Sequence, residues 1–369
     1  MQKRTNTADL IGQLLIIGLD GAEISLQLRS LLTRIQPAGV ILFARNIVKA
    51  EQTWRLLKDC QTCVSTPLFA CVDLEGGKVD RFRDVLGPTP SAADVFATSD
   101  RKLFRKHGRI VGASCRAMGF NFDLAPVVDL ACATSHTVMG SRVVSDDPRK
   151  VVTYAREFLA GLREARVFGA VKHFPGLGDA SLDTHHALPR VNKSWRKLWE
   201  QDLAPYRALR REAAVLVGHA AYPQVTGDCC PASLSRKWVT DVLRKKIRYR
   251  GLVLSDDLEM GGVLKAAPIE QAALKFIRAG GNLCLICHSQ EHILSCYQAL
   301  MDEAQSDRKF AQQVQDAASQ VLAFKRQSRE LRGRERAPSE QKIQGLSRQL
   351  WEFGEQVRLK TISSAREPA

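Results

Sequence analysis

Short apolar runs alternate with longer segments of helical periodicity along most of the chain. Such runs are typical of buried strands, and apolar residues in the segments between them recur at the spacing of one helix face. Two clear helical segments span residues 150–165 and 269–279. The predicted strands are residues 13–19, 38–45, 68–73, 121–129, 168–174, 214–220, 251–257 and 282–288.

Strands that alternate with helices in this way pair in parallel, and eight such units close a (β/α)8 barrel. We therefore expect an α/β fold built as a single (β/α)8 TIM-type barrel over residues 1–328. An open doubly wound sheet is the alternative, because periodicity alone does not show that a sheet closes.

After residue 328 the composition becomes polar and charged, and an amphipathic stretch spans residues 343–359. We expect residues 329–369 to form a basic C-terminal extension, either a helix packed on the barrel or a partly disordered tail. A helix that binds a partner protein is the alternative.

The chain carries 54 lysines and arginines against 39 aspartates and glutamates, a formal net charge of +15. Such an excess favours anionic partners. The basic residues are scattered over predicted helix surfaces, however, and become dense only after Lys325. This distribution is typical of solvated faces, so we expect no nucleic-acid partner.

The ten cysteines fall singly or in apolar runs and do not form the framework of a small disulfide-rich domain. This usage favours a reducing, cytoplasmic location. The run CLICH at residues 284–288 has the spacing of a c-type haem attachment site. Residues three apart on a strand point to opposite faces, so the two thiols are not expected to reach one haem.

The N-terminal apolar run follows two basic residues, as in a weak signal peptide, but Gln13 interrupts it and acidic residues follow. A first core strand is therefore expected here. No apolar stretch approaches the ~20 residues of a membrane-spanning helix.

Ionisable residues stand at the ends of five predicted strands, which is where barrel enzymes carry their chemistry. Asp257 could serve as a helix cap. So many charges at one mouth are hard to explain as structure alone, because a buried charge needs a partner or a ligand. The residues are Asp73, Asp129, Lys172, His173, His219, Asp256 and Asp257.

Several reaction classes lack their motifs, since the chain has no GxSxG, HExxH or GxxxxGK[ST] sequence. GLGDAS begins like a dinucleotide loop but lacks the third glycine. The histidines and aspartates of residues 173–186 have suitable side chains for a metal, and acid/base catalysis is the other use of the same groups.

A series of long motifs makes acid/base catalysis the specific expectation. The motifs are AGVILFARN, CVDLEGGKVDRF, FDLAPVVD, MGSRVVSDDP, KHFPGLGDASLDTHHALP and VLSDDLEMGG. The chain resembles glycoside hydrolase family 3, in its bacterial β-N-acetylglucosaminidase branch, over roughly residues 10–325. The resemblance implies a barrel enzyme that removes terminal N-acetylglucosamine from cell-wall-derived or related β-glycosides with retention of configuration. It implies a carbohydrate substrate, no metal, no cofactor and a monomer.

The resemblance also assigns roles to residues of this chain. Asp256, the first aspartate of SDDLEM, is the implied nucleophile, and His185 of DTH is the implied general acid/base, held by Asp183. A histidine near its ordinary pKa of about 6.5 can protonate the leaving group and then deprotonate water. The residues implied to grip the terminal sugar are Asp73, Arg81, Arg142, Lys172 and His173.

Three residues depart from the usual family pattern. Leu177 replaces the histidine of PGHGD, and Leu74 and Lys78 replace residues of DQEGGR. Leucine forms no side-chain hydrogen bond, so polar support of the sugar pocket is expected to be weaker. A sugar-binding pseudoenzyme, a β-glycoside phosphorylase and another family-3 exo-glycosidase are the alternative functions.

Overall fold

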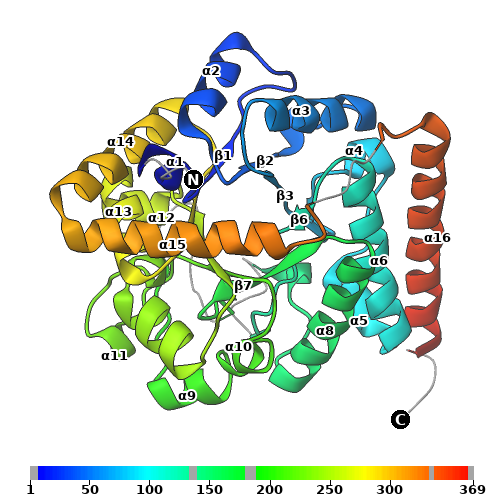
Figure 1. The fold of residues 1–369 in the computed structure, drawn as a ribbon. Coiled ribbons are helices and arrows are strands. Elements are labelled where there is room, and N and C mark those ends of the chain that lie inside the picture. The colour runs from blue at the N-terminus through cyan, green and yellow to red at the C-terminus, as the bar shows by residue number, and fades with distance from the viewer. Residues whose placement is uncertain (1–6, 133–138, 179–187, 332–335, 365–369) are drawn as a thin grey trace.

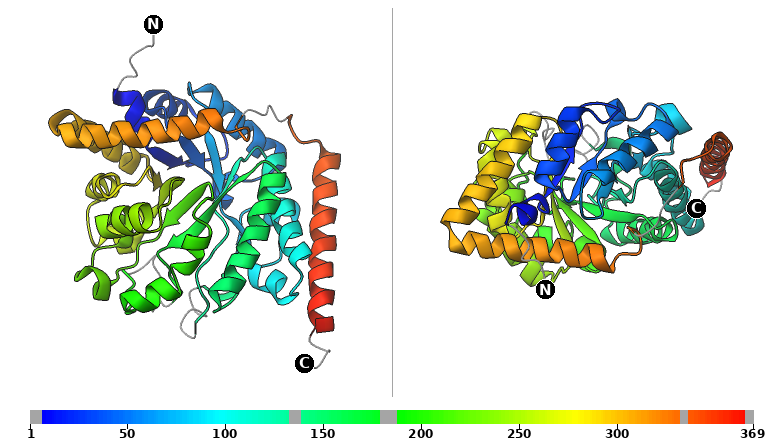
Figure 2. Two further views of the ribbon diagram at one scale, coloured as in Figure 1. Left: turned by 60° about the horizontal axis from the view of Figure 1, so that its bottom comes forward. Right: turned by 45° about the horizontal axis from the view of Figure 1, so that its top comes forward.

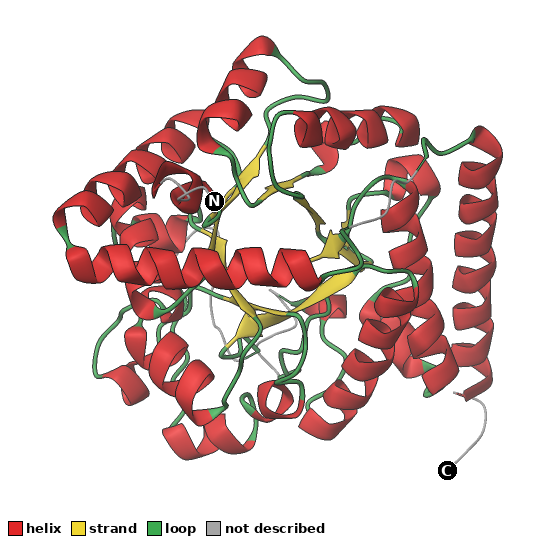
Figure 3. Ribbon diagram, in the orientation of Figure 1, coloured by secondary structure: helices red, strands yellow, loops and turns green. Residues whose placement is uncertain are grey.

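The structure is a computed structural model that describes residues 7–132, 139–178, 188–331 and 336–364. Parallel strands form a closed barrel in which each strand pairs with the next and the last returns to the first (Figure 3). All eight predicted strands are confirmed, and closure excludes the open sheet. In barrel order they are β1 (Leu15–Gly18), β2 (Gly39–Ile41), β3 (Phe69–Val72), β6 (Phe122–Asp123), β7 (Phe168–Phe174), β8 (Ala214–Val217), β9 (Leu252–Asp257) and β10 (Leu283–Ile286).

Helices surround the barrel on its outside (Figure 1). The longer ones are amphipathic and bury one face against the strands or a neighbouring helix. They are α1 (Thr7–Gly12), α2 (Leu26–Ile35), α3 (Ala50–Thr62), α4 (Arg83–Leu86), α5 (Ala92–Ala97), α6 (Arg101–Ala117), α8 (Pro148–Glu164), α9 (Trp195–Glu200), α10 (Ala204–Ala208), α11 (Pro223–Thr226), α12 (Gly261–Leu264), α13 (Ile269–Ala279), α14 (Gln290–Ser306), α15 (Arg308–Gln327) and α16 (Glu340–Ser364). A π-helical segment, Lys237–Lys246, precedes β9.

Alternate strand residues face two separate apolar layers, as the pleat of a strand requires. Leu15 and Ile17 pack outward against the helices, whereas Ile16 packs inward with the residues that fill the barrel. Cys284 belongs to the outer layer and Cys287 to the inner one, so the two thiols of CLICH lie on opposite sides of the sheet. This confirms that they do not form a haem attachment pair. All ten cysteines are free thiols.

One end of the barrel is crossed by α15 (Figure 2). Phe324 near the end of this helix packs against Phe168 of β7 and Phe69 of β3, with ring centroids 5.0 and 6.0 Å apart. Lys325 beside it is buried and donates to the side chain of Gln13 at 2.9 Å. These residues close the end at which the strands begin.

The amphipathic stretch of residues 343–359 lies within α16, which runs along the outside of α6 (Figure 1). Phe353 is fully buried there, and its ring lies 5.7 Å from that of His107 on α6. Within the described residues, no helix is long and apolar enough to cross a membrane.

A short antiparallel hairpin, β4 (Leu74–Gly76) and β5 (Val79–Asp80), follows β3 at the other end of the barrel. Gly76 has a φ of +84°, and a Cβ at this position would lie 2.1 Å from the Pro90 carbonyl oxygen. A glycine is therefore required to make the tight turn here. The hairpin brings Glu75 and Arg81 over the barrel mouth.

Candidate active site

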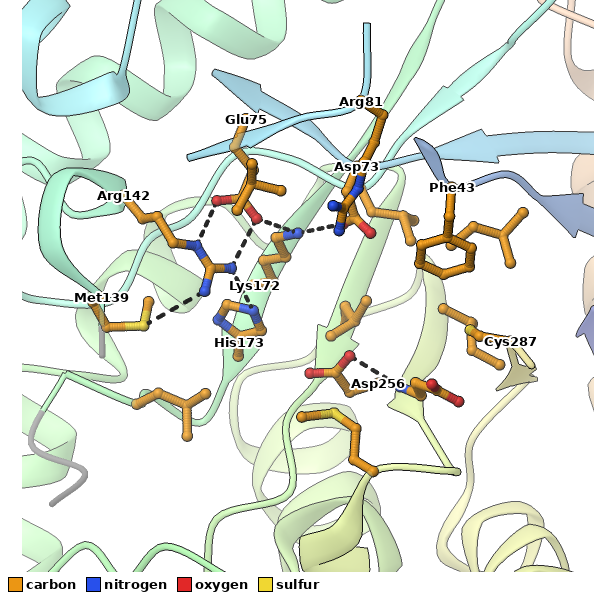
Figure 4. Close-up of a pocket in the computed structure, with 18 of the residues that line it drawn as sticks. Phe43, Asp73, Glu75, Arg81, Met139, Arg142, Lys172, His173, Asp256 and Cys287 are labelled. Carbon is orange, nitrogen blue, oxygen red and sulfur yellow. Dashed lines mark hydrogen bonds and ion pairs between the residues drawn. The ribbon is translucent and has the colours of Figure 1, made fainter. Parts of the chain in front are cut away.

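A pocket of about 210 Å³ opens where the barrel strands end (Figure 4). Its wall combines apolar residues from the barrel interior with charged residues from the strand ends and the hairpin. The predicted site residues that line it are Asp73, Arg81, Arg142, Lys172, His173 and Asp256. The two other predicted catalytic residues, Asp183 and His185, lie outside the described residues.

A network of buried ion pairs forms one side of the pocket (Figure 4). The Lys172 ammonium lies 2.7 Å from Asp73 Oδ1 and 2.6 Å from Glu75 Oε1. Arg142 donates to both oxygens of Glu75, at 2.7 and 2.8 Å. Two cations thus face two carboxylates, and the bidentate fork fixes the guanidinium in one plane.

The charges of this network keep Glu75 and Lys172 ionised. Burial alone would raise the pKa of Glu75, but Arg142 and Lys172 outweigh it and hold that pKa well below its usual range. Burial alone would lower the pKa of Lys172, and the carboxylates of Asp73 and Glu75 raise it instead. The pocket therefore offers fixed charges that do not titrate near neutrality.

His173 is held from behind by Asp129, which is fully buried. Asp129 Oδ2 lies 2.7 Å from His173 Nδ1, and Oδ1 accepts the backbone N–H of Leu177 at 2.7 Å. When Nδ1 donates to this carboxylate, His173 Nε2 carries no proton and acts as an acceptor. Arg142 Nη2 lies 3.3 Å from it. The imidazole therefore presents a defined nitrogen to the pocket.

Asp256 stands at the end of β9 and faces this charged wall across the pocket (Figure 4). Its Oδ1 accepts the backbone N–H of Asp257 at 2.9 Å. Burial alone would raise the pKa of Asp256, but the groups around it, which include the Lys172 ammonium and the backbone N–H of Asp257, lower it overall. No ion pair engages this carboxylate among the described residues, so it remains an anion open to the pocket.

The neighbouring aspartate turns to the rim instead. Asp257 Oδ1 accepts the backbone N–H of Glu259 at 3.0 Å, and Oδ2 lies 3.3 Å from Nε2 of His288. The next helix, α12, begins only at Gly261 and has Met260 at its N-cap position. The prediction that Asp257 caps a helix is therefore wrong, because the carboxylate closes a local turn and pairs with a histidine.

His219, another strand-end residue, is fully buried beneath Asp256 and Asp257. Its Nε2 lies 2.9 Å from the Asp257 carbonyl oxygen and its Nδ1 lies 2.8 Å from the Ser233 hydroxyl. Burial lowers the pKa of His219. A neutral ring that donates from Nε2 to the carbonyl satisfies both contacts, so His219 supports the strand end rather than carrying charge.

Comparisons with known proteins agree with this geometry. Residues 7–324 match the "Glycosyl hydrolase family 3 N terminal domain". This chain belongs to glycosyl hydrolase family 3. A β-hexosaminidase of Alkalilimnicola ehrlichii is 35% identical over 296 residues, which cover 78% of this chain and 84% of that protein. A β-hexosaminidase of Xanthomonas oryzae is 34% identical over 285 residues, which cover 75% of this chain and 84% of that protein.

Solved structures of the family have the same fold. A family-3 β-N-acetylglucosaminidase from Paenibacillus superposes with a TM-score of 0.88 at 29% identity, covering 95% of this chain and 69% of that one. A β-N-acetylhexosaminidase from Beutenbergia cavernae superposes with a TM-score of 0.80 at 28% identity, covering 87% and 98%. The protein is accordingly a glycoside hydrolase of family 3 with a TIM-type barrel.

The three departures from the family pattern fall in different environments. The Leu74 side chain is buried in the outer apolar layer and does not line the pocket. Its backbone N–H donates to Asp123 Oδ1 at 3.0 Å. Lys78 is exposed and also lies outside the pocket wall. Leu177 does line the pocket. The expected loss of polar support in the sugar pocket therefore concerns Leu177 alone.

Two residues of this family-3 site were missing from the predicted set. Glu75 stands two residues after Asp73 in CVDLEGG, and the signal was a second carboxylate beside two glycines that permit a tight hairpin. Asp129 was noted only as a strand end. Within the part of the chain that the structure describes, no group of three or more histidine, cysteine, aspartate or glutamate residues could hold a metal ion.

Proposed function

We propose that this family-3 hydrolase is a retaining exo-β-N-acetylglucosaminidase. It releases terminal N-acetylglucosamine from cell-wall-derived or related β-glycosides. The observation that carries the proposal is the ionised carboxylate of Asp256, which is free of ion pairs with described residues and faces a wall of fixed charges in the pocket at the barrel mouth. The names of the related β-hexosaminidases and of the Paenibacillus enzyme support the choice of sugar.

In the proposed mechanism, a carboxylate oxygen of Asp256 attacks the anomeric carbon while the bond to the leaving oxygen breaks. His185 gives its proton to that oxygen, and a covalent glycosyl-enzyme forms. Water then attacks the same carbon from the vacated side, His185 takes the proton, and Asp256 leaves. Asp183 orients the imidazole and stabilises its charged form. Two inversions give net retention.

The charged wall suits the recognition of a terminal sugar. Asp73 and Glu75 can accept hydrogen bonds from sugar hydroxyls, while Lys172 and Arg142 can donate to hydroxyl or carbonyl oxygens. Arg81 supports the same role because its buried Nε has no hydrogen-bond partner among the described residues. A small pocket of about 210 Å³ lined in this way suits a single terminal sugar.

The ten free thiols fit a reducing compartment, so we place the reaction in the cytoplasm. A cytoplasmic enzyme of this specificity would meet imported cell-wall fragments. We also propose that the protein acts as a monomer, with the barrel as its catalytic unit and residues 329–369 as an extension.

A product assay on a panel of p-nitrophenyl β-glycosides tests the proposal. We expect release of N-acetylglucosamine from its β-glycoside with the β-anomer formed first, and slower release from the β-glucoside. A parallel reaction with inorganic phosphate detects sugar 1-phosphate. Binding without turnover, an α-anomer as first product, or preferential formation of sugar 1-phosphate would each contradict the proposal.

A further inference from the structure

An arginine-lined hollow lies at the end of the barrel opposite the catalytic mouth. Arg210 and Arg211 stand in the turn before β8, and Arg248 and Arg250 stand in the turn before β9. Because β8 and β9 pair directly, the two turns lie side by side. Their side chains line one hollow of about 420 Å³ together with Phe324 of α15, the helix across this end in Figure 1.

The positive charge of this hollow is not neutralised by the described residues. None of the four arginines forms an ion pair with a described carboxylate, and the carboxylate in the hollow, Glu212, already lies 2.6 Å from Arg163 outside it. Four guanidinium groups of like charge repel one another where they gather. A bound anion would remove that repulsion.

A fifth arginine contacts a residue that lines the hollow. Arg244 is largely buried and donates to the Gly251 carbonyl oxygen at 2.7 Å, a neutral acceptor. Burial lowers the pKa of Arg244 to about 10, and the charge of Arg250 acts in the same direction. Arg244 thus adds a further positive charge next to the wall of the hollow.

The backbone is strained at one of the four arginines. Arg248 has a φ of +63°, in the left-handed region where a turn normally places glycine. Arg248 thus adopts a conformation that L-residues avoid, and it lines the hollow.

We infer that this hollow is a binding site for a small anion that carries two or more phosphate groups. Guanidinium forks match phosphate oxygens in pairs, and each phosphate can engage two of them. The half-buried ring of Phe324 supplies an apolar floor for the rest of such a ligand. The site lies apart from Asp256 and has no part in glycoside hydrolysis.

Calorimetric titration with inorganic tripolyphosphate tests the inference. We expect saturable binding to the full chain, weaker at 200 mM than at 50 mM salt because phosphate contacts are screened. The double variant Arg211→Ala, Arg250→Ala should lose at least tenfold in affinity. Conversion of the same two residues to lysine should lose less than the alanine pair, since charge persists without the fork.

The control variant is Arg55→Ala, Arg196→Ala. It removes the same charge from exposed arginines that pair with glutamates of their own helices at 2.9 and 3.0 Å. Its affinity should stay within twofold of the parent. An unchanged circular dichroism spectrum and thermal unfolding midpoint of the Arg211, Arg250 double variant will show that it is folded, whatever the proposed function proves to be.

The inference is overturned if tripolyphosphate gives no saturable heat. It is likewise overturned if the Arg211→Ala, Arg250→Ala variant and the Arg55→Ala, Arg196→Ala control lose affinity equally. It is also overturned if a single-stranded RNA binds through Arg211 and Arg250 while tripolyphosphate does not, since the hollow would then serve a nucleic acid.

Discussion

Replacement of Asp129 by asparagine should damage the sugar pocket although the residue itself does not line it. The carboxylate accepts from His173 Nδ1 and from the backbone N–H of Leu177, each at 2.7 Å, through different oxygens. An asparagine has one oxygen and one NH2 group. Whichever way the amide turns, one of these two donors meets an NH2 group.

The two orientations of the amide have different consequences. If the oxygen faces Leu177, the imidazole must move its proton to Nε2, which then points at an Arg142 N–H 3.3 Å away. If the oxygen faces His173, the Leu177 N–H loses its acceptor. A buried unsatisfied donor costs about 1–3 kcal/mol, so we expect a loss of that size in the free energy of unfolding.

The same substitution should reduce kcat/KM by roughly 10- to 100-fold, because each tenfold corresponds to about 1.4 kcal/mol of lost transition-state binding. Steady-state kinetics on p-nitrophenyl N-acetyl-β-glucosaminide and urea unfolding measure the two quantities. The matched control is Ile277→Val in the last turn of α13, a buried residue at the opposite end of the barrel, where β10 begins. It should lose about 0.5–1.5 kcal/mol of stability with normal kinetics. An Asp129→Asn enzyme with unchanged kcat/KM would refute the reasoning.

Three further predictions concern the nucleophile, the acid/base residue and a buried lysine. Asp256→Ala should abolish turnover without unfolding, and an activated fluoro-sugar should label Asp256 in the parent; a label on Asp257 would contradict the assignment. His185→Ala should slow a poor leaving group by ~10²–10⁴-fold and spare the first step with dinitrophenol, whereas an equal loss on all substrates would argue against acid/base catalysis. Burial lowers the pKa of Lys325 to about 7, so the unfolded chain binds more protons between pH 7 and 10 and stability should rise with pH there, by about 2 kcal/mol from pH 7 to 9. Denaturant unfolding of Lys325→Met should lack this rise, and an identical pH profile in both proteins would exclude the lysine as its source.

The strands were predictable because each one is buried on both faces and reads as a continuous apolar run. β10 is an example, since all of Leu283–Ile286 is apolar and buried. Closure into a barrel could not be read from the runs, because it depends on the pairing of β1 with β10, whose residues are far apart in the sequence, as Leu15 and Cys284 are.

The site was predictable only where a residue belongs to a continuous motif. Lys172 and His173 stand together in KHFPGLGD, and Asp256 stands in SDDLEM. The partners that fix them are distant in sequence, with Glu75 67 residues before Arg142 and Asp129 44 residues before His173. Side-chain pairing over such separations follows from three-dimensional packing, which no local pattern encodes.

The contact between Phe353 and His107 means that the chain cannot be shortened to its family-matched segment without chemical consequence. Residues 7–324 end before α16, so that segment lacks the ring that covers the imidazole. Burial lowers the pKa of His107 to about 3, and its Nε2 has no hydrogen-bond partner among the described residues. Once uncovered, the ring could take up a proton in mildly acidic buffer. The Nε2 atom of His107 lies close to Gly76, the residue that follows Glu75. A trimmed enzyme would therefore acquire an acid-sensitive charge next to Glu75.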